Sequence, residues 1–119
     1  IIRATVESVA YQTYDLFEAM KNDGLKPKLI KVDGGMVQNN WFSQFLADTI
    51  NTKVLRPKVN ETTALGAAFM AGLQIGVYKS LKDISKNWQA DKSFSPKMKL
   101  SERKKLIEGW NKAIQKTLS

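Results

Sequence analysis

The sequence has no cysteine and no histidine among its 119 residues. Without cysteine, the chain cannot form a disulfide scaffold or a cysteine-ligated metal site. Without histidine, a zinc site would depend on carboxylates alone, and the serine–histidine and cysteine–histidine nucleophile pairs are excluded. Any catalysis would therefore have to use carboxylates, lysine or a bound nucleotide, and we expect no metal ligands in this chain.

The sequence also lacks a long apolar run, and we expect no signal peptide. Its apolar stretches are far shorter than the roughly 20 residues that a membrane helix needs. Hydrophobic residues make up 43% and charged residues 25%, which is typical of a globular chain. We expect no membrane span, and a single domain or part of one. Because the chain opens on Ile1, already inside a periodic apolar pattern, we expect it to be a part of something larger.

Positive charge is concentrated in the second part of the chain. Residues 1–76 carry 8 Lys or Arg and 7 Asp or Glu, whereas residues 77–119 carry 11 and 4. Such a basic tail can bind nucleic acid or an acidic surface. However, the chain has 16 Lys and only 3 Arg, and specific recognition relies more on the arginine fork. We expect a solvated lysine-rich surface and no specific nucleic-acid partner, with a basic binding module as the alternative.

The spacing of apolar residues predicts helices that alternate with short strands. The predicted helices lie at 2–20, from 39 or 40 to 50, and at 62–75, and the strands lie at 29–32 and 53–56. Two strands separated by a helix of about a dozen residues fit a parallel crossover. The fold class is therefore α/β in the order α-β-α-β-α. Because two strands do not make a stable parallel sheet, we expect further strands from sequence outside this chain.

Glycine and asparagine mark several of the predicted helix ends. Gly24 and Gly76 follow the first and third helices and suit helix termination. Asn39 suits the N-cap of the second helix. Residues 77–119 are predicted to form a basic, mostly helical tail, with a short helix at 80–84, an extended stretch at 89–100 and a last helix capped by Ser101.

The most informative stretch is 32–40 (VDGGMVQNN), where a strand ends, two glycines follow and a helix begins. The carboxyl end of a parallel strand is where open α/β sheets bind ligands. Gly34 and Gly35 carry no Cβ that would keep a flat ring or a phosphate away from the backbone. Asn39 adds an amide donor and acceptor, the pair needed to read a purine edge. A plain structural turn remains the alternative for these residues.

A second stretch, 61–68 (ETTALGAA), gives the third helix an unusually small face. Gly66 inside a helix costs about 1 kcal/mol relative to alanine, which suggests that another backbone must approach closely. Tight helix packing is the favoured interpretation here, with ligand contact as the alternative.

These two stretches, in this order and spacing, resemble the C-terminal, nucleotide-binding half of the FGGY carbohydrate kinases. Two further segments, 7–13 (ESVAYQT) and 109–113 (GWNKA), are similar to the branch of the family that acts on glycerol. The resemblance covers essentially the whole chain, so residues 1–119 are expected to be the C-terminal part of that nucleotide-binding domain.

The resemblance implies an actin-like, ribonuclease H-like fold and transfer of the γ-phosphoryl group of MgATP to a polyol hydroxyl, here giving glycerol 3-phosphate. By the match, Gly35 and Asn39 would contact the adenine side of ATP, and Gly34 would line the same turn. Asp33 is read as a turn-former and not as a base. The glycerol pocket, the catalytic base, the phosphate loops and the Mg²⁺ ligand belong to preceding family residues that have no counterpart here.

The segment alone is therefore expected to be inactive. The resemblance implies that the full-length protein is a cytoplasmic homo-oligomer that binds ATP, ADP and glycerol. A kinase of another polyol or sugar is the alternative within the family.

Overall fold

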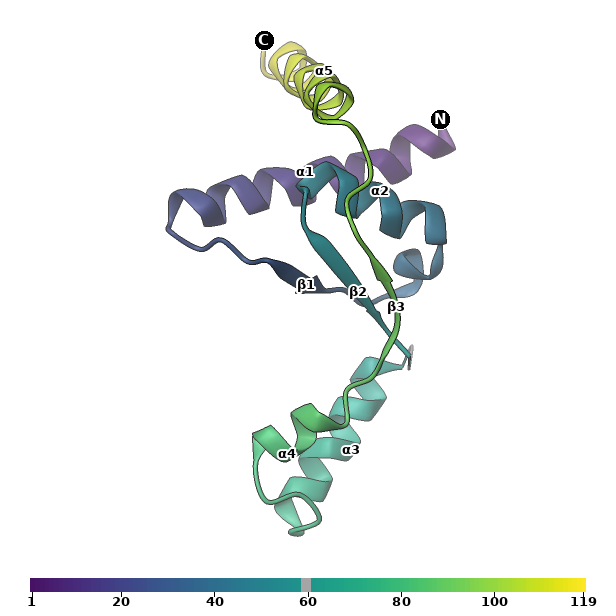
Figure 1. The fold of residues 1–119 in the computed structure, drawn as a ribbon, viewed down its shortest axis with the longest axis vertical. Helices are drawn as coiled ribbons and strands as arrows, with labels where there is room; N and C mark the ends of the chain where they lie inside the picture. Colours follow the sequence, from purple (N-terminus) through teal and green to yellow (C-terminus); the bar gives the residue numbers. More distant parts are fainter. Residues whose placement is uncertain (59–60) are drawn as a thin grey trace.

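The computed structural model describes residues 1–58 and 61–119, and it is an α/β structure (Figure 1). Its elements in chain order are α1 (Ile2–Asn22), β1 (Leu29–Lys31), the 3₁₀ turn η1 (Gly35–Gln38), α2 (Asn40–Ile50), β2 (Lys53–Pro57), α3 (Thr62–Gln74), α4 (Leu81–Lys86), β3 (Ala90–Phe94) and α5 (Leu100–Leu118). The predicted α-β-α-β-α order is confirmed. The 3₁₀ turn between β1 and α2 was not predicted.

The sheet is mixed and has the strand order β1-β2-β3. β1 and β2 are parallel, with Ile30 opposite Val54, and α2 forms the crossover between them, as predicted. β3 pairs with β2 in the antiparallel direction, with Ser93 opposite Leu55. The stretch predicted only as extended therefore supplies a third strand. In β3 only Phe94 is buried, so the hydrophobic pattern of this strand is too weak to mark it in the sequence.

The hydrophobic core lies where α1 and α2 cover the sheet (Figure 1). Most of α2, from Phe42 to Ile50, is buried, which explains why its apolar residues extend around most of the helix. Leu106 and Trp110 of α5 pack against the edge of this core. The core consists of Ala10, Tyr11, Phe17, Val37, Phe42, Phe45, Leu46, Ala47, Ile50, Val54, Phe94 and Ile107.

Helices α3 and α4 extend from the end of the sheet as an arm (Figure 1). Within this arm the ring of Phe69 meets the ring of Tyr78 edge to face, with 5.6 Å between their centroids. The close packing predicted around Gly66 is not found in the described part of the chain, because a Cβ there would meet no atom within 4 Å. The tight position is Gly72, where a Cβ would lie 2.8 Å from the Tyr78 ring.

The glycine ends of α1 and α3 are confirmed. Gly24 has φ +88° and Gly76 has φ +84°, and both lie just beyond the last helical turn. After α1, the backbone N–H of Leu25 donates to the Met20 carbonyl at 2.9 Å, closing the Schellman-type bond that satisfies a helix-end carbonyl.

The predicted cap of the last helix is wrong. α5 begins at Leu100 with Lys99 as its N-cap, two residues before Ser101. The Asp48 carboxylate accepts the backbone N–H of Lys97 at 2.7 Å and that of Met98 at 3.2 Å. This long-range anchor fixes the direction in which the chain enters α5, and it overrides the local preference for serine as a cap.

Two glycine substitutions should have opposite effects on stability. Gly24→Ala forces a Cβ into a left-handed conformation and should destabilise the protein by about 1–2 kcal/mol. Gly109→Ala lies inside α5, where a Cβ meets no atom within 4 Å, and should stabilise the helix by about 1 kcal/mol. Thermal melting of both variants checks this expectation, which fails if the two melting temperatures move in the same direction.

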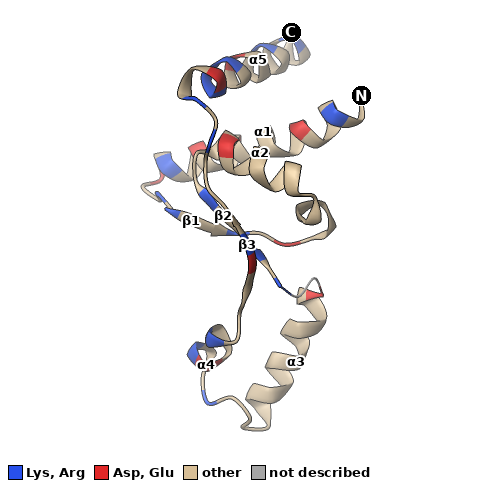
Figure 2. Ribbon diagram, turned by 45° about the vertical axis from the view of Figure 1, so that its right-hand side comes forward, with Lys and Arg blue, Asp and Glu red and all other residues tan. Residues whose placement is uncertain are grey.

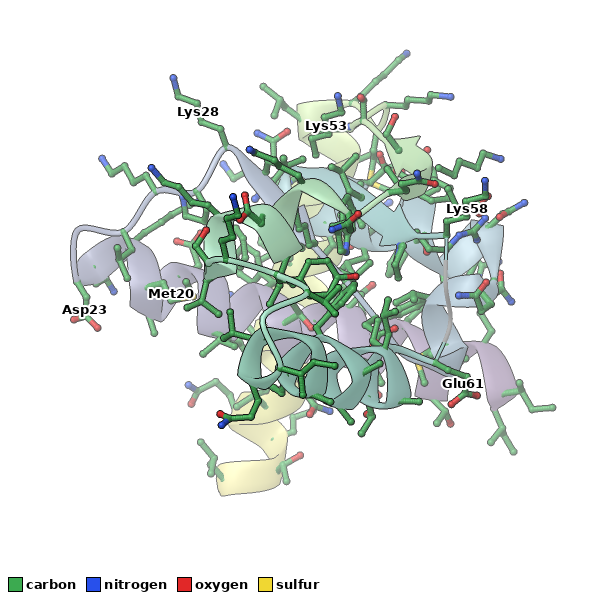
Figure 3. All side chains as sticks on the ribbon, turned by 90° about the horizontal axis from the view of Figure 1, so that it is seen from below. Met20, Asp23, Lys28, Lys53, Lys58 and Glu61 are labelled. Carbon is green, nitrogen blue, oxygen red and sulfur yellow. The ribbon has the colours of Figure 1, made fainter. Side chains whose placement is uncertain are left out.

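The lysine side chains point into solvent over much of the surface. Lys28, Lys53 and Lys58 project outward from the strands and their connections (Figure 3). Basic residues are also spread along α5 (Figure 2). None of the helices in the described ranges is both long and apolar enough to cross a membrane. Residues 77–119 contain α4, β3 and α5, and their treatment as a separate tail remains a prediction.

Candidate functional site

The predicted glycine turn lies at the carboxyl end of β1. The Val32 N–H donates to the Leu55 carbonyl at 3.0 Å, which continues the strand ladder up to the turn. Asp33, Gly34 and Gly35 follow immediately and are all exposed. η1 and α2 then lead the chain back over the sheet. The residues that the sequence singled out therefore lie together on one exposed edge, where a ligand can approach the backbone.

Only one of the two glycines in this turn has a backbone conformation that requires glycine. Gly34 has φ +108°, a region that side chains rarely adopt, so the turn itself requires glycine here. Gly35 has no such φ, and a Cβ built on it would meet no atom within 4 Å among the described residues. The structural-turn interpretation therefore accounts for Gly34. It does not account for Gly35, whose open surface suits contact with a ligand.

Asn39 is the N-cap of α2, as predicted. Its side-chain Oδ1 accepts the backbone N–H of Phe42 at 3.2 Å. Asn39 also lines a groove of about 420 Å³ together with Ile2, Arg3, Val6 and Trp41. The cap occupies one of the two lone pairs of Oδ1, so the amide keeps its Nδ2 donors and one acceptor position for a ligand.

Arg56 is a residue of this site that the sequence analysis missed. Its Nη1 donates to the carbonyls of Val37 at 3.2 Å and Gln38 at 3.0 Å, and to Asn40 Oδ1 at 2.8 Å. Its Nη2 and Nε donate to Asp91 Oδ2 at 2.7 Å and 3.1 Å. The sequence could have indicated Arg56 through the alternation of side chains along β2. This alternation places Arg56 on the same buried face as Val54.

A second hydrogen bond supports the same turn from α2. The hydroxyl of Ser43, which is fully buried, donates to the Val37 carbonyl at 2.7 Å. The Val37 carbonyl is therefore held by both Ser43 and Arg56. As a result, hydrogen bonds from Ser43 and Arg56 hold the segment that joins Gly35 to Asn39 in place, while the outer side of this segment stays exposed.

A larger groove of about 610 Å³ lies between α1 and α5 and contains none of the three candidate residues. Here Tyr11 stacks on Trp110 with 5.3 Å between ring centroids, so the segments 7–13 and 109–113 meet. Burial, together with the nearby Glu7 carboxylate, raises the pKa of Tyr11. Across the described residues there is no cluster of three or more acidic side chains that could hold a metal ion.

Comparisons with known proteins match this chain to one family. Residues 1–75 match the C-terminal domain of the FGGY family of carbohydrate kinases. A curated relative, a glycerol kinase from Gluconobacter oxydans (strain 621H), is 49% identical over 120 aligned residues, covering 100% of this chain and 23% of the relative.

Solved structures of the same family share the fold. A Plasmodium falciparum glycerol kinase with ADP has a TM-score of 0.84 and 38% identity, over 100% of this chain and 24% of that one. A gluconate kinase and a xylulose kinase from Lactobacillus acidophilus have TM-scores of 0.73 and 0.71 and identities of 26% and 25%, each over 90% of this chain and 21% of theirs.

The chain thus spans about a quarter of the length of the relatives it matches. Its likeness to these kinases confirms the predicted fold class, part of an actin-like, ribonuclease H-like domain. On the match of residues 1–75 to the C-terminal domain, the chain belongs to the FGGY family of carbohydrate kinases.

Proposed function

We propose that the full-length protein is an ATP-dependent kinase that transfers the γ-phosphoryl group to glycerol and releases glycerol 3-phosphate. This chain would supply the adenosine-binding part. The identity of 49% to a glycerol kinase supports the glycerol assignment, and the ADP present with the similar Plasmodium falciparum glycerol kinase supports an adenine nucleotide. The lower identities to the gluconate and xylulose kinases make another sugar the weaker candidate.

The proposed adenosine site rests on the exposed turn at Gly34 and Gly35, which follows the parallel strand β1. A glycine with neither a left-handed φ nor a close neighbour leaves room for a flat ring or a ribose against the chain. Asn39 Nδ2 would donate to a ring nitrogen of the adenine. Gly34 would hold the turn in its shape. The Gly35 backbone, the Asn39 amide and Gly34 would therefore have different roles at the same exposed edge.

ATP would supply the phosphoryl group, and Mg²⁺ would neutralise charge on it. We assign no residue of this chain to Mg²⁺, because the family resemblance implies that its ligand belongs to residues outside this chain. The catalytic base, the phosphate loops and the glycerol pocket are expected in the preceding part of the full-length protein. The chain's own contribution is to bind and orient the adenosine, and we place the full-length enzyme in the cytoplasm as a homo-oligomer.

Substituting Asn39 separates its two roles. Asn39→Ser keeps a capping oxygen but loses the amide, so ATP affinity should fall about 2- to 12-fold, as expected for one neutral hydrogen bond. The melting temperature without ATP should stay near that of the wild type. Asn39→Ala should show the same loss of ATP affinity and, in addition, lose about 0.5–2 kcal/mol of stability from the missing cap.

Calorimetric titration with MgADP and thermal melting of the full-length variants provide both readouts. A normal ADP affinity in Asn39→Ser would restrict Asn39 to its capping role.

The alternative function, a basic binding module, predicts different behaviour. We expect the lysine-rich tail to bind nucleic acid only weakly and without sequence preference, because specific recognition relies more on arginine and strong single-strand binding relies on free aromatic platforms. Binding of single-stranded and duplex DNA should disappear as the salt concentration rises to physiological values. Tight, sequence-dependent binding at physiological salt would favour the module.

A further inference from the structure

Arg56 places a positive charge in the interior of the molecule. The residue is 7% exposed and its side chain 8%. A buried charge is costly unless it is paired and hydrogen-bonded. All three guanidinium nitrogens of Arg56 have acceptors, so the charge is satisfied. These contacts join Arg56 to other segments of the chain.

The two ends of the guanidinium hold different parts of the chain. Nη1 contacts the turn before α2, at Gln38 and Asn40 among others, whereas Nε and Nη2 contact Asp91 on β3. These partners lie 16 to 35 residues away from Arg56 in the sequence. A lysine ammonium has three donors, but they share one nitrogen and lack the extended planar fork of arginine. The planar fork of arginine is therefore specifically suited to this junction.

The turn-side contacts flank Asn39. Arg56 binds the carbonyl of Gln38, the preceding residue, and the side chain of Asn40, the following residue. Asn39 is also tied to α2 through its cap bond to Phe42. The backbone around the candidate donor is thus fixed before any ligand arrives. Fixing a binding group in advance lowers the entropy cost of binding.

We propose that Arg56 is a positioning residue for nucleotide binding, acting through the segment from Val37 to Asn40. This inference rests on the proposed function, because it assumes that Asn39 and Gly35 meet adenosine. Arg56 is too deeply buried to touch a nucleotide on the exposed side of the turn. Its role is to hold the turn against the sheet so that the Asn39 amide points in one direction.

The test is steady-state kinetics of the full-length protein carrying Arg56→Lys. Misplacing the Asn39 amide weakens its proposed hydrogen bond to the nucleotide, so we expect the KM for ATP to rise by up to the loss expected on removing that bond, about 2- to 12-fold. The KM for glycerol should remain unchanged. A general loss of folded protein would lower the maximal rate and leave both KM values unchanged. A rise in the KM for ATP alone therefore distinguishes a positioning role from mere structural support.

Arg103→Lys is the matched control. Arg103 is a partly buried arginine whose Nε donates to the Thr49 carbonyl at 2.9 Å, away from the turn. This variant should leave both KM values near those of the wild type. An Arg56→Lys protein that folds and shows an unchanged KM for ATP would overturn the inference, as would equal ATP effects in the two variants.

Asn40→Ala provides a second route if Arg56→Lys does not fold. It removes one turn-side acceptor from an exposed residue, and the KM for ATP should rise about 2- to 5-fold. An unchanged value would then overturn the inference. Where both single variants fold, their combination should raise the KM no further than Arg56→Lys alone, because both act through the same contact. Additive effects would instead mean that Asn40 acts independently of Arg56.

Failure of this inference can be told apart from failure of the proposed function. If Gly35→Val raises the KM for ATP but Arg56→Lys does not, only the positioning role of Arg56 is contradicted. If neither change affects ATP kinetics, the turn does not bind the nucleotide, and both the proposed adenosine site and the positioning role are contradicted.

Discussion

Gly35→Val in the full-length protein should raise the KM for ATP about 5- to 150-fold, corresponding to 1–3 kcal/mol of steric conflict. The branched side chain would occupy the space against the backbone where the ring or ribose is proposed to lie. The KM for glycerol should change little, because no glycerol contact is expected in this chain. Initial rates measured over a range of ATP at saturating glycerol, and the reverse, give both constants.

The same substitution should cost the ligand-free protein little stability. Gly35 has no left-handed φ, and a Cβ there meets no atom within 4 Å of the described chain. Gly34→Ala is the matched comparison, because the φ of +108° should make it lose about 1–3 kcal/mol even without ATP. A large loss of stability in Gly35→Val without ATP would mean that the fold itself requires glycine at this position.

The 119-residue chain alone should transfer no phosphate from MgATP to glycerol. It spans about a quarter of its relatives, and the residues that the family resemblance assigns to the phosphates, the metal and glycerol have no counterpart in it. Phosphoryl transfer depends on positioning and charge stabilisation at the γ-phosphate, and the proposed adenosine contacts provide neither. ADP release by purified chain should therefore equal that of a blank without protein. Turnover that survives repeated purification would show that this segment carries catalytic groups.

The isolated chain should also expose apolar surface. This effect should be smaller than the loss of activity, and it too follows from the chain spanning only about a quarter of its relatives. The arm leaves several large apolar side chains open, with Ile75 77% and Met70 53% exposed. β1 forms one edge of the sheet and offers unpaired backbone groups. Self-association in sedimentation experiments and binding of a hydrophobic dye are the expected results. A monodisperse monomer with a cooperative melt would contradict them.

Local signals were sufficient for much of the fold. The periodicity of α1 and α2 follows from their burial against one another and the sheet, so the sequence displays it directly. Gly24, Gly76 and Asn39 mark helix ends through short-range hydrogen bonds, which depend on residues only a few positions away. These features were predictable because each one leaves a pattern within a short stretch of the sequence.

Features set by distant residues were not predictable. β3 is a strand because its backbone pairs with β2, although its side chains are mostly exposed. The start of α5 is fixed by Asp48, about 50 residues away. The different needs of Gly34 and Gly35 depend on φ, which the sequence does not display. The Arg56 contacts join two segments that only the folded sheet brings together.

A crystal structure of the full-length protein with MgADP would show whether the turn from Gly34 to Asn39 binds adenosine. We expect the adenosine to lie against the Gly35 backbone, with Asn39 Nδ2 within about 3.2 Å of a ring nitrogen. The Arg56 contacts to Gln38 and Asn40 should be the same as in the chain described here. An ADP whose adenosine lies elsewhere, with the turn open to solvent, would contradict the account.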